Sequence, residues 1–265
     1  MDYLAGWLNH FRANRSKASQ EVAGDRLTEM EKRLIGRSIA AFQLGEYSEG
    51  KGLMRAAGAY AREIGDDRLV EITKLFILEE QRHAGLLLGY MNRHGIAQLK
   101  RHWADGVFRR LRKDVGLEVS TTVLITAEII SLVYYRALRA STGSVRLQVI
   151  CDEILEDEAA HVRYGSGLIG MLRAGRSWPG GRLSELLHEI LFAGTVLVVF
   201  AGHGRVLAAG GYGFGRYWRA CWSEFGECFG AGRVQGTSGM SFEEGGGRTG
   251  RESSGPRFGR SQSLF

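Results

Sequence analysis

Four long segments of this chain carry apolar residues at every third or fourth position, and this spacing constrains the fold more than any other feature. An α-helix turns once in about 3.6 residues, so the spacing places these side chains on one face that must be buried. Patterns typical of strands are almost absent. We therefore predict an all-α protein with a four-helix bundle over residues 28–175. The expected helices are 28–64, 68–91, 116–140 and 145–172.

The remaining segments are expected to add to this bundle. Residues 1–27 form an amphipathic N-terminal segment whose apolar face either packs on the bundle or touches a membrane surface. After a turn at 177–181, residues 183–231 carry two further helices, over 183–207 and 212–229. Residues 232–265 are rich in Gly, Arg and Ser, and we expect them to be disordered because they hold too few apolar side chains to form a core. The N-terminal apolar residues are Leu4, Trp7, Leu8 and Phe11.

Composition excludes several classes of protein. The three cysteines form no Cys-x-x-Cys pair, which argues against a disulfide framework and against a zinc ribbon. The net charge of +6 is spread along the chain, and its most basic stretch, 100–113, is expected to be a solvated connector and not a nucleic-acid patch. No secretory signal is evident, and the longest apolar run, 190–201, is too short to span a bilayer. A cytoplasmic protein is expected.

The motif Glu-x-x-His occurs three times, and two of its copies lie on the faces expected to point inward. Glu80 with His83 is on the second predicted helix, and Glu158 with His161 is on the fourth. Residues three apart in a helix share a face, so each pair can bind one metal ion from one side. The third copy, Glu185 with His188, is attributed to chance.

The spacing around the turns places a further carboxylate opposite each motif. Glu128 and Glu158 are equidistant from Gly143, and Glu49 and Glu80 are nearly equidistant from Gly65. Residues equidistant from the turn of an antiparallel hairpin lie at the same height. Two such hairpins would bring four carboxylates and two imidazoles together, and two divalent ions would balance the carboxylate charge.

This ligand pattern resembles that of the ferritin-like di-iron carboxylate proteins, in which two helices each give one Glu and two others each give Glu-x-x-His. The sequences of residues 79–83 and 157–161 are similar to two motifs of the soluble acyl-carrier-protein desaturases, except that Ala160 stands where that family has Arg. The resemblance implies that Asp157 hydrogen-bonds His83 and that Glu79 hydrogen-bonds His161. Arylamine oxygenases carry an extra histidine at the position of Ile154, so their chemistry is disfavoured.

The identity of the ligand on the first helix stays open. Hairpin symmetry favours Glu49, whereas resemblance to the Gly-Glu-Ser pattern of rubrerythrins favours Glu46, which follows Gly45. The two glutamates are three residues apart, so we expect only one to be a ligand. In the predicted site, Glu80 and His83 bind one ion and Glu158 and His161 the other. Glu128 and one of Glu46 or Glu49 bridge the ions or complete their ligand sets.

The predicted function is that of an oxidoreductase in which two iron ions activate O₂ to oxidise a small organic substrate, an acyl chain being one candidate. Carboxylates with two imidazoles suit iron, with manganese as the alternative. Electrons would come from a separate donor protein, since no flavin or nicotinamide motif is present, and a homodimer is compatible with this reading. One alternative is iron or peroxide handling, as in ferritins and rubrerythrins. Another is a non-enzymatic bundle that binds RNA or a protein through residues 100–113.

Overall fold

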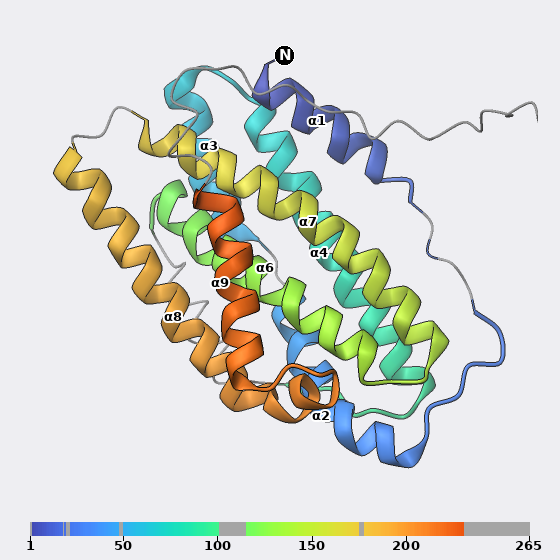
Figure 1. Ribbon diagram of the computed structural model, residues 1–265. Helices are drawn as coiled ribbons and strands as arrows, with labels where there is room; N and C mark the ends of the chain where they lie inside the picture. The colour runs from blue at the N-terminus through green and yellow to red at the C-terminus, as the bar shows by residue number, and fades with distance from the viewer. Residues whose placement is uncertain are drawn as a thin grey trace, which may run out of the picture.

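A computed structural model of the chain describes residues 2–17, 19, 22–47, 50–100, 115–174 and 178–230. All regular secondary structure in these ranges is helical, which confirms the all-α prediction. The bundle consists of α2 (Glu29–Glu46), α4 (Arg68–Arg93), α6 (Leu117–Ala140) and α7 (Val145–Arg173). Helix α6 packs along α7, and α4 lies against both α2 and α7 (Figure 1).

Capping residues fix where two of the bundle helices begin. The Thr28 side chain accepts a hydrogen bond from the backbone of Glu31, whose own side chain accepts one from the Thr28 backbone, so that α2 starts with a capping box. Ser144 caps α7 by accepting from the backbone of Leu147. Because α6 ends at Ala140 and α7 begins at Val145, the two helices form a tight antiparallel hairpin.

The prediction of one continuous helix over 28–64 is wrong. Helix α2 ends at Glu46, and a separate helix, α3 (Lys51–Ile64), follows. Gly50 precedes α3 with a left-handed backbone, at φ 62°, and a Cβ atom placed there would lie 2.2 Å from the Cδ1 atom of Ile77 on α4. Only glycine combines this conformation with so close an approach to α4, so Gly50 permits the break.

We expect Gly50→Ala to destabilise the metal-free protein by about 2–4 kcal/mol, because alanine meets both backbone strain and the Ile77 side chain. Gly58→Ala is the matched control, since Gly58 lies within α3 and a Cβ atom there would meet nothing nearer than the Arg62 guanidinium, at 3.8 Å. That control should be neutral or stabilising by up to about 1 kcal/mol. Urea unfolding of both variants checks this, and equal stabilities would contradict the assigned role of Gly50.

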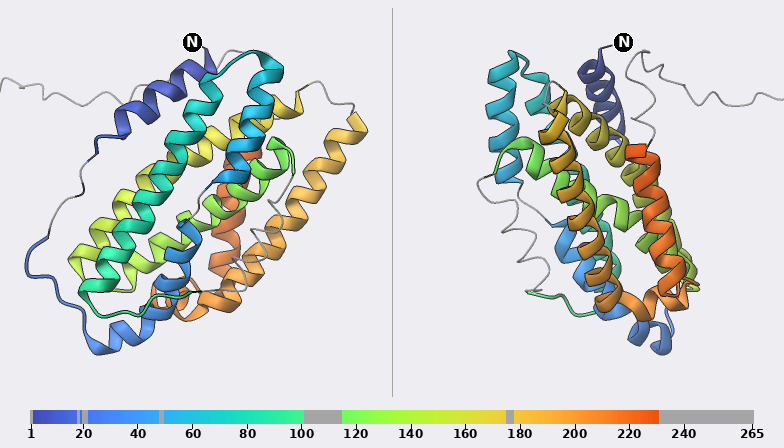
Figure 2. Two further views of the ribbon diagram at one scale, coloured as in Figure 1. Left: turned by 180° about the vertical axis from the view of Figure 1, so that it is seen from behind. Right: turned by 60° about the vertical axis from the view of Figure 1, so that its left-hand side comes forward.

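The N-terminal helix packs on the bundle. Helix α1 (Tyr3–Asn14) lies against α4, and its whole apolar stripe is buried (Figures 1 and 2). Of the two expectations for this segment, packing on the bundle is therefore the one that the structure shows. The Tyr3 hydroxyl also donates to the backbone oxygen of Tyr164, which ties the beginning of α1 to α7.

Two more helices cover the outside of the bundle. Helices α8 (Trp178–Ala209) and α9 (Phe214–Gly230) pack against α6 and against each other (Figures 1 and 2). Helix α8 begins at Trp178, whereas the sequence predicts a turn over residues 177–181 and a helix that begins at 183. Proline is tolerated in the first turn of a helix because that turn's backbone N–H groups have no helical acceptor, so Pro179 does not prevent this start.

Two helices, α6 and α8, are long and apolar enough to cross a membrane by length and composition. The apolar run 190–201 therefore belongs to a longer apolar helix than the run alone indicates. Most of α6 is buried within the bundle, which explains its composition, whereas α8 keeps an outer face with exposed apolar side chains. These exposed side chains include Leu183, Leu186, Leu187, Ile190 and Leu197.

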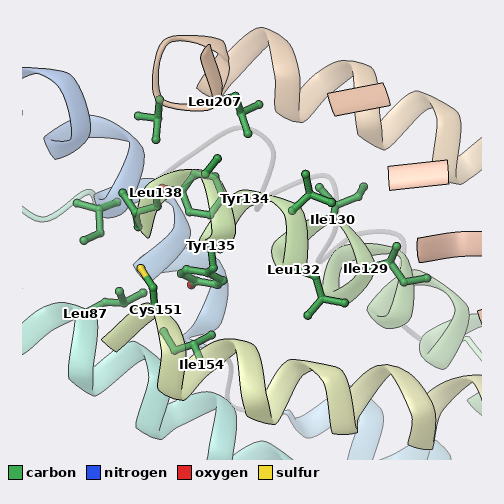
Figure 3. Packing of buried hydrophobic residues seen from close by; sticks show 14 of the residues in the cluster. Leu87, Ile129, Ile130, Leu132, Tyr134, Tyr135, Leu138, Cys151, Ile154 and Leu207 are labelled. Carbon is green, nitrogen blue, oxygen red and sulfur yellow. The ribbon is translucent and has the colours of Figure 1, made fainter. Parts of the chain in front are cut away.

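The main hydrophobic core surrounds α6. Figure 3 shows Tyr135 of α6 close to Cys151 and Ile154 of α7, with Tyr134 turned toward the side on which Leu207 of α8 lies. All five side chains are essentially inaccessible to solvent. The predicted disordered tail, 232–265, and most of the basic connector lie outside the described residues.

Candidate metal centre

Carboxylates and imidazoles from four helices converge inside the bundle. They form two groups, and within each group the potential ligand atoms all lie within 4.8 Å of one another. The first group draws on α2, α4 and α7, and the second on α4, α6 and α7. The groups are Glu46, Glu80, His83 and Glu158, and then Glu80, Glu128, Glu158 and His161.

Glu80 and Glu158 belong to both groups, so each can bridge two metal positions. Each of the other four residues belongs to one group: Glu46 with His83, and Glu128 with His161. The sequence leaves open whether Glu128 and the ligand on the first helix bridge the ions or complete their ligand sets. In the structure Glu46 and Glu128 belong to different groups, so each is placed to complete the ligand set of one ion. Glu80 and Glu158 lie between the two groups.

The imidazoles face the shared carboxylates with their Nδ1 atoms. His83 Nδ1 lies 3.2 Å from Glu158 Oε1 and 3.8 Å from Glu80 Oε1. His161 Nδ1 lies 3.1 Å from Glu80 Oε1 and 3.5 Å from Glu158 Oε2. Each histidine thus contacts the glutamate of its own motif and, at shorter range, the glutamate of the other. This crossing is possible because α4 and α7 lie side by side.

The opposite edge of each imidazole meets a carboxylate of the other helix. His83 Nε2 lies 3.0 Å from Asp157 Oδ2, and His161 Nε2 lies 2.9 Å from Glu79 Oε2. These are the two contacts that the resemblance implied. A carboxylate acceptor holds the proton on Nε2 and leaves the Nδ1 lone pair free for a metal ion.

Several atoms at the centre lack hydrogen-bond partners among the described residues. They are Glu80 Oε1, both carboxylate oxygens of Glu158, and the Nδ1 atoms of His83 and His161. A buried polar atom without a partner is costly, and such atoms are rare in folded proteins. Here the unpartnered atoms point toward one another, as donors to a shared cation would.

Burial and mutual repulsion perturb the two carboxyls that belong to one group each. Burial raises the pKa of Glu46 well above its ordinary value, and the charges of Glu80 and Glu158 raise it further. The pKa of Glu128 is raised well above its ordinary value for the same reasons, burial first and then the charges of Glu158 and Glu80. In the metal-free protein these two groups therefore favour the protonated form, and a bound cation would replace their protons.

At the two histidines the surroundings favour the charged form instead of the neutral one. Burial disfavours the imidazolium, but the hydrogen bond to Asp157 and the nearby carboxylate of Glu158 outweigh it and raise the pKa of His83 to about 10. Burial also disfavours the charged form of His161, but the nearby carboxylates of Glu158, Glu79 and Glu80 outweigh it and raise its pKa well above the ordinary value. In the metal-free protein, bound protons thus balance part of the buried carboxylate charge. Four carboxylates and two neutral imidazoles match the charge of two divalent cations.

The two candidate ligands near the end of α2 differ in what the structure describes. Glu49 lies outside the described residues, so of the two candidates near the end of α2 the structure places only Glu46 in the cluster. The third motif lies elsewhere: Glu185 forms an exposed ion pair with Arg182, and His188 is buried 3.2 Å from Thr126 Oγ1. Glu185 and His188 thus have different partners and do not form a common ligand pair, which agrees with the attribution of this motif to chance.

One contact at the centre comes from a residue to which the sequence assigns no role as a ligand or as a partner of a ligand. The Tyr135 hydroxyl donates to Glu46 Oε1 over 2.6 Å, and the whole residue is buried. The register of Tyr135 with Glu128, seven residues apart on α6, is the signal that places it on the inner face, although the same signal describes any core tyrosine. Its hydrogen bond orients the carboxylate of Glu46.

We expect Tyr135→Phe to weaken metal binding about tenfold at the position of Glu46 and His83, because outer hydrogen bonds orient ligand carboxylates. The position of Glu128 and His161 should change little. Tyr134→Phe is the control, since the Tyr134 hydroxyl lies 2.9 Å from Ser38 Oγ. Stepwise Co²⁺ titration separates the two positions, and an equal loss at both, or no loss, would argue against this role.

Comparison with known protein families, with curated proteins and with solved structures finds no match for this chain. The case for a metal centre therefore rests on the residues themselves. A cluster of buried carboxylates and histidines that could hold metal ions lies at the middle of a helical bundle.

Proposed function

We propose that the protein is a di-iron oxidoreductase of the ferritin-like type, in which O₂ is used to oxidise a small organic substrate. One observation carries the proposal: two four-residue ligand groups share Glu80 and Glu158. Sharing of two carboxylates is the arrangement needed to hold two cations next to each other and to neutralise their repulsion. Oxygen-rich ligand sets with one imidazole per ion suit iron or manganese better than copper, and zinc seldom takes so many carboxylates.

In this proposal, each residue of the cluster has a distinct task. Glu80 and Glu158 would serve both metal positions, and Glu46 and Glu128 would each complete the ligand set of one position. His83 and His161 bind through Nδ1, because Asp157 and Glu79 hold their Nε2 protons. When bound, the two ions supply the electrons that O₂ activation requires, and a separate donor protein restores them.

Burial supports oxidative chemistry over simple metal storage at a surface. The side chains of His83, Glu158 and His161 are inaccessible to solvent. A water-poor site protects a reactive oxidant from quenching and strengthens the electrostatic hold on bound cations. We propose a small organic substrate on these grounds, with an acyl chain as the candidate suggested by the resemblance to soluble desaturases.

The test is to purify the protein without chelators, measure iron and manganese per chain, and then follow O₂ consumption by the reduced protein. The proposal expects about two iron ions per chain and rapid O₂ consumption that stops after one turnover unless a reductant is supplied. A matched sample of Glu80→Ala/Glu158→Ala protein controls for adventitious iron.

The same experiment separates the alternatives. Continued uptake of Fe²⁺ beyond two ions per chain, with formation of a ferric core, would favour iron storage. Turnover of hydrogen peroxide in preference to O₂ would favour peroxide handling. Absence of bound metal together with tight RNA binding would replace the proposal with a non-enzymatic role.

A further inference from the structure

Helix α1 brings one polar side chain to the back of the candidate metal centre. Asn14 is the last residue of α1, one turn beyond Phe11 and on the same face. Its Nδ2 atom lies 3.0 Å from Glu79 Oε1 and 2.9 Å from Asp157 Oδ1. These carboxylates come from α4 and α7, so one amide group joins three helices.

We propose that Asn14 is a positioning residue of the metal centre, which fixes both histidine ligands through the carboxylates that orient them. This inference rests on the proposed dimetal function. It assigns to the N-terminal helix a part in metal binding, although α1 supplies no ligand.

The division of oxygen atoms supports this role. Glu79 uses Oε2 for His161 and Oε1 for Asn14, and Asp157 uses Oδ2 for His83 and Oδ1 for Asn14. Each carboxylate therefore has one oxygen for the imidazole and another for the amide. A carboxylate held at both oxygens cannot rotate away from its histidine.

The chemistry of asparagine suits the position between two anions. Its amide nitrogen carries two hydrogens, which is one donor for each carboxylate, and the group adds no charge. Glu79 and Asp157 are almost fully buried, so their charges need donors from the protein. Asp157 has further support from Arg82 and from Lys17, whose Nζ lies 3.3 Å away.

The packing of α1 holds Asn14 in place. Phe11 is inaccessible to solvent and stacks on His161, with ring centroids 5.9 Å apart and planes inclined by 26°. The same helix thus contacts His161 directly through Phe11 and indirectly through Asn14 and Glu79. A displacement of α1 would remove the stacking of Phe11 on His161. It would also free Glu79 and Asp157, which hold the two histidines.

Because Asn14 touches both carboxylates, its loss should affect both metal positions together. We expect Asn14→Leu to weaken each of two Co²⁺ binding steps about tenfold, since residues that support metal ligands from outside commonly change affinity by that factor or more. Asn14→Asp is close in size but replaces the donor with a third carboxylate. It should weaken binding more than Asn14→Leu does.

Asn14→Leu removes both donors without adding charge, whereas Asn14→Asp also adds repulsion between carboxylates. Loss of affinity in Asn14→Leu protein that melts as the parent does therefore separates positioning from packing. Arg12→Ala is the control on the same helix, because Arg12 makes an exposed ion pair with Glu71 and contacts neither carboxylate. It should bind Co²⁺ as the parent does.

The measurement is titration with Co²⁺ followed by absorption and calorimetry, with circular dichroism melting of the metal-free proteins to show that each variant is folded. Folded Asn14 variants with parental affinity at both steps would overturn the inference while leaving the dimetal proposal intact. An equal loss in Arg12→Ala would also overturn it, since helix docking alone would then explain the effect. A parent protein that binds no Co²⁺ would overturn both proposals.

Discussion

The double variant Glu80→Ala/Glu158→Ala is expected to bind no divalent metal ion while keeping the helical content of the parent. Both residues belong to both ligand groups, so their removal leaves one carboxylate and one imidazole at each position. Two ligands do not hold Fe²⁺ or Mn²⁺ against water at ordinary concentrations. Metal content should fall from about two ions per chain to the background of the assay.

The folded structure should survive, because these carboxylates crowd a buried site and do not fill an apolar core. Glu80 and Glu158 repel Glu46 and Glu128 but also stabilise the charged forms of His83 and His161, so their removal takes away repulsion and attraction together and should leave the helical content of the metal-free protein unchanged. Glu71→Ala/Glu185→Ala is the matched control, since it removes two exposed glutamates from surface ion pairs. Normal metal content in the Glu80 and Glu158 variant would contradict the site assignment.

Single substitutions at the two unshared glutamates should each remove one of the two ions. Glu46 belongs only to the group of His83, and Glu128 only to the group of His161. We expect Glu46→Gln and Glu128→Gln each to lose at least about 100-fold in affinity at one position, because a neutral amide replaces a charged ligand. The other position should keep most of its affinity. Calorimetric titration with Co²⁺ resolves the two steps.

Glu49→Gln completes this series, since Glu49 is the alternative to Glu46 that hairpin symmetry favours. With Glu46 as the ligand, the Glu49 variant should bind two ions as the parent does. Complete loss of both ions in either Glu46→Gln or Glu128→Gln would indicate that the two positions are not separable. Loss in Glu49→Gln with none in Glu46→Gln would reverse the assignment of the ligand near the end of α2.

Much of the fold and of the candidate site could be predicted from periodicity. Helices α4, α6 and α7 lie close to their predicted bounds, because each is long and has a nearly uninterrupted inner face. The two Glu-x-x-His motifs stand at equal distances from turns, and this symmetry was enough to place them with Glu128 at one level. The contacts of Asp157 and Glu79 with the histidines were implied by the resemblance.

The break between α2 and α3 could not be predicted from periodicity, because the apolar spacing continues through it. Gly50 permits it through a left-handed backbone and a close approach to Ile77, and that approach depends on how α3 packs against α4. For the same reason, hairpin symmetry around Gly65 gave no reliable choice between Glu46 and Glu49. Comparing the number of residues from Gly65 to each glutamate assumes that one straight helix connects the turn to the ligand.

The role of Asn14 had no signal in the sequence. Its position follows from the docking of α1, more than one hundred residues from Asp157 along the chain, and a lone asparagine at the end of a short helix looks like any capping residue. Sharing of Glu80 and Glu158 by both groups was also beyond sequence reasoning. It depends on the crossing of α4 and α7, which sets which carboxylate faces which imidazole.

The most direct test of the dimetal centre is anomalous diffraction at the iron absorption edge from crystals grown with Fe²⁺ under anaerobic conditions. The dimetal proposal predicts two anomalous peaks inside the bundle, one beside Glu46 and His83 and one beside Glu128 and His161, each close to Glu80 and Glu158. No peak in this cluster, with the carboxylates and imidazoles paired only among themselves, would contradict the central claim.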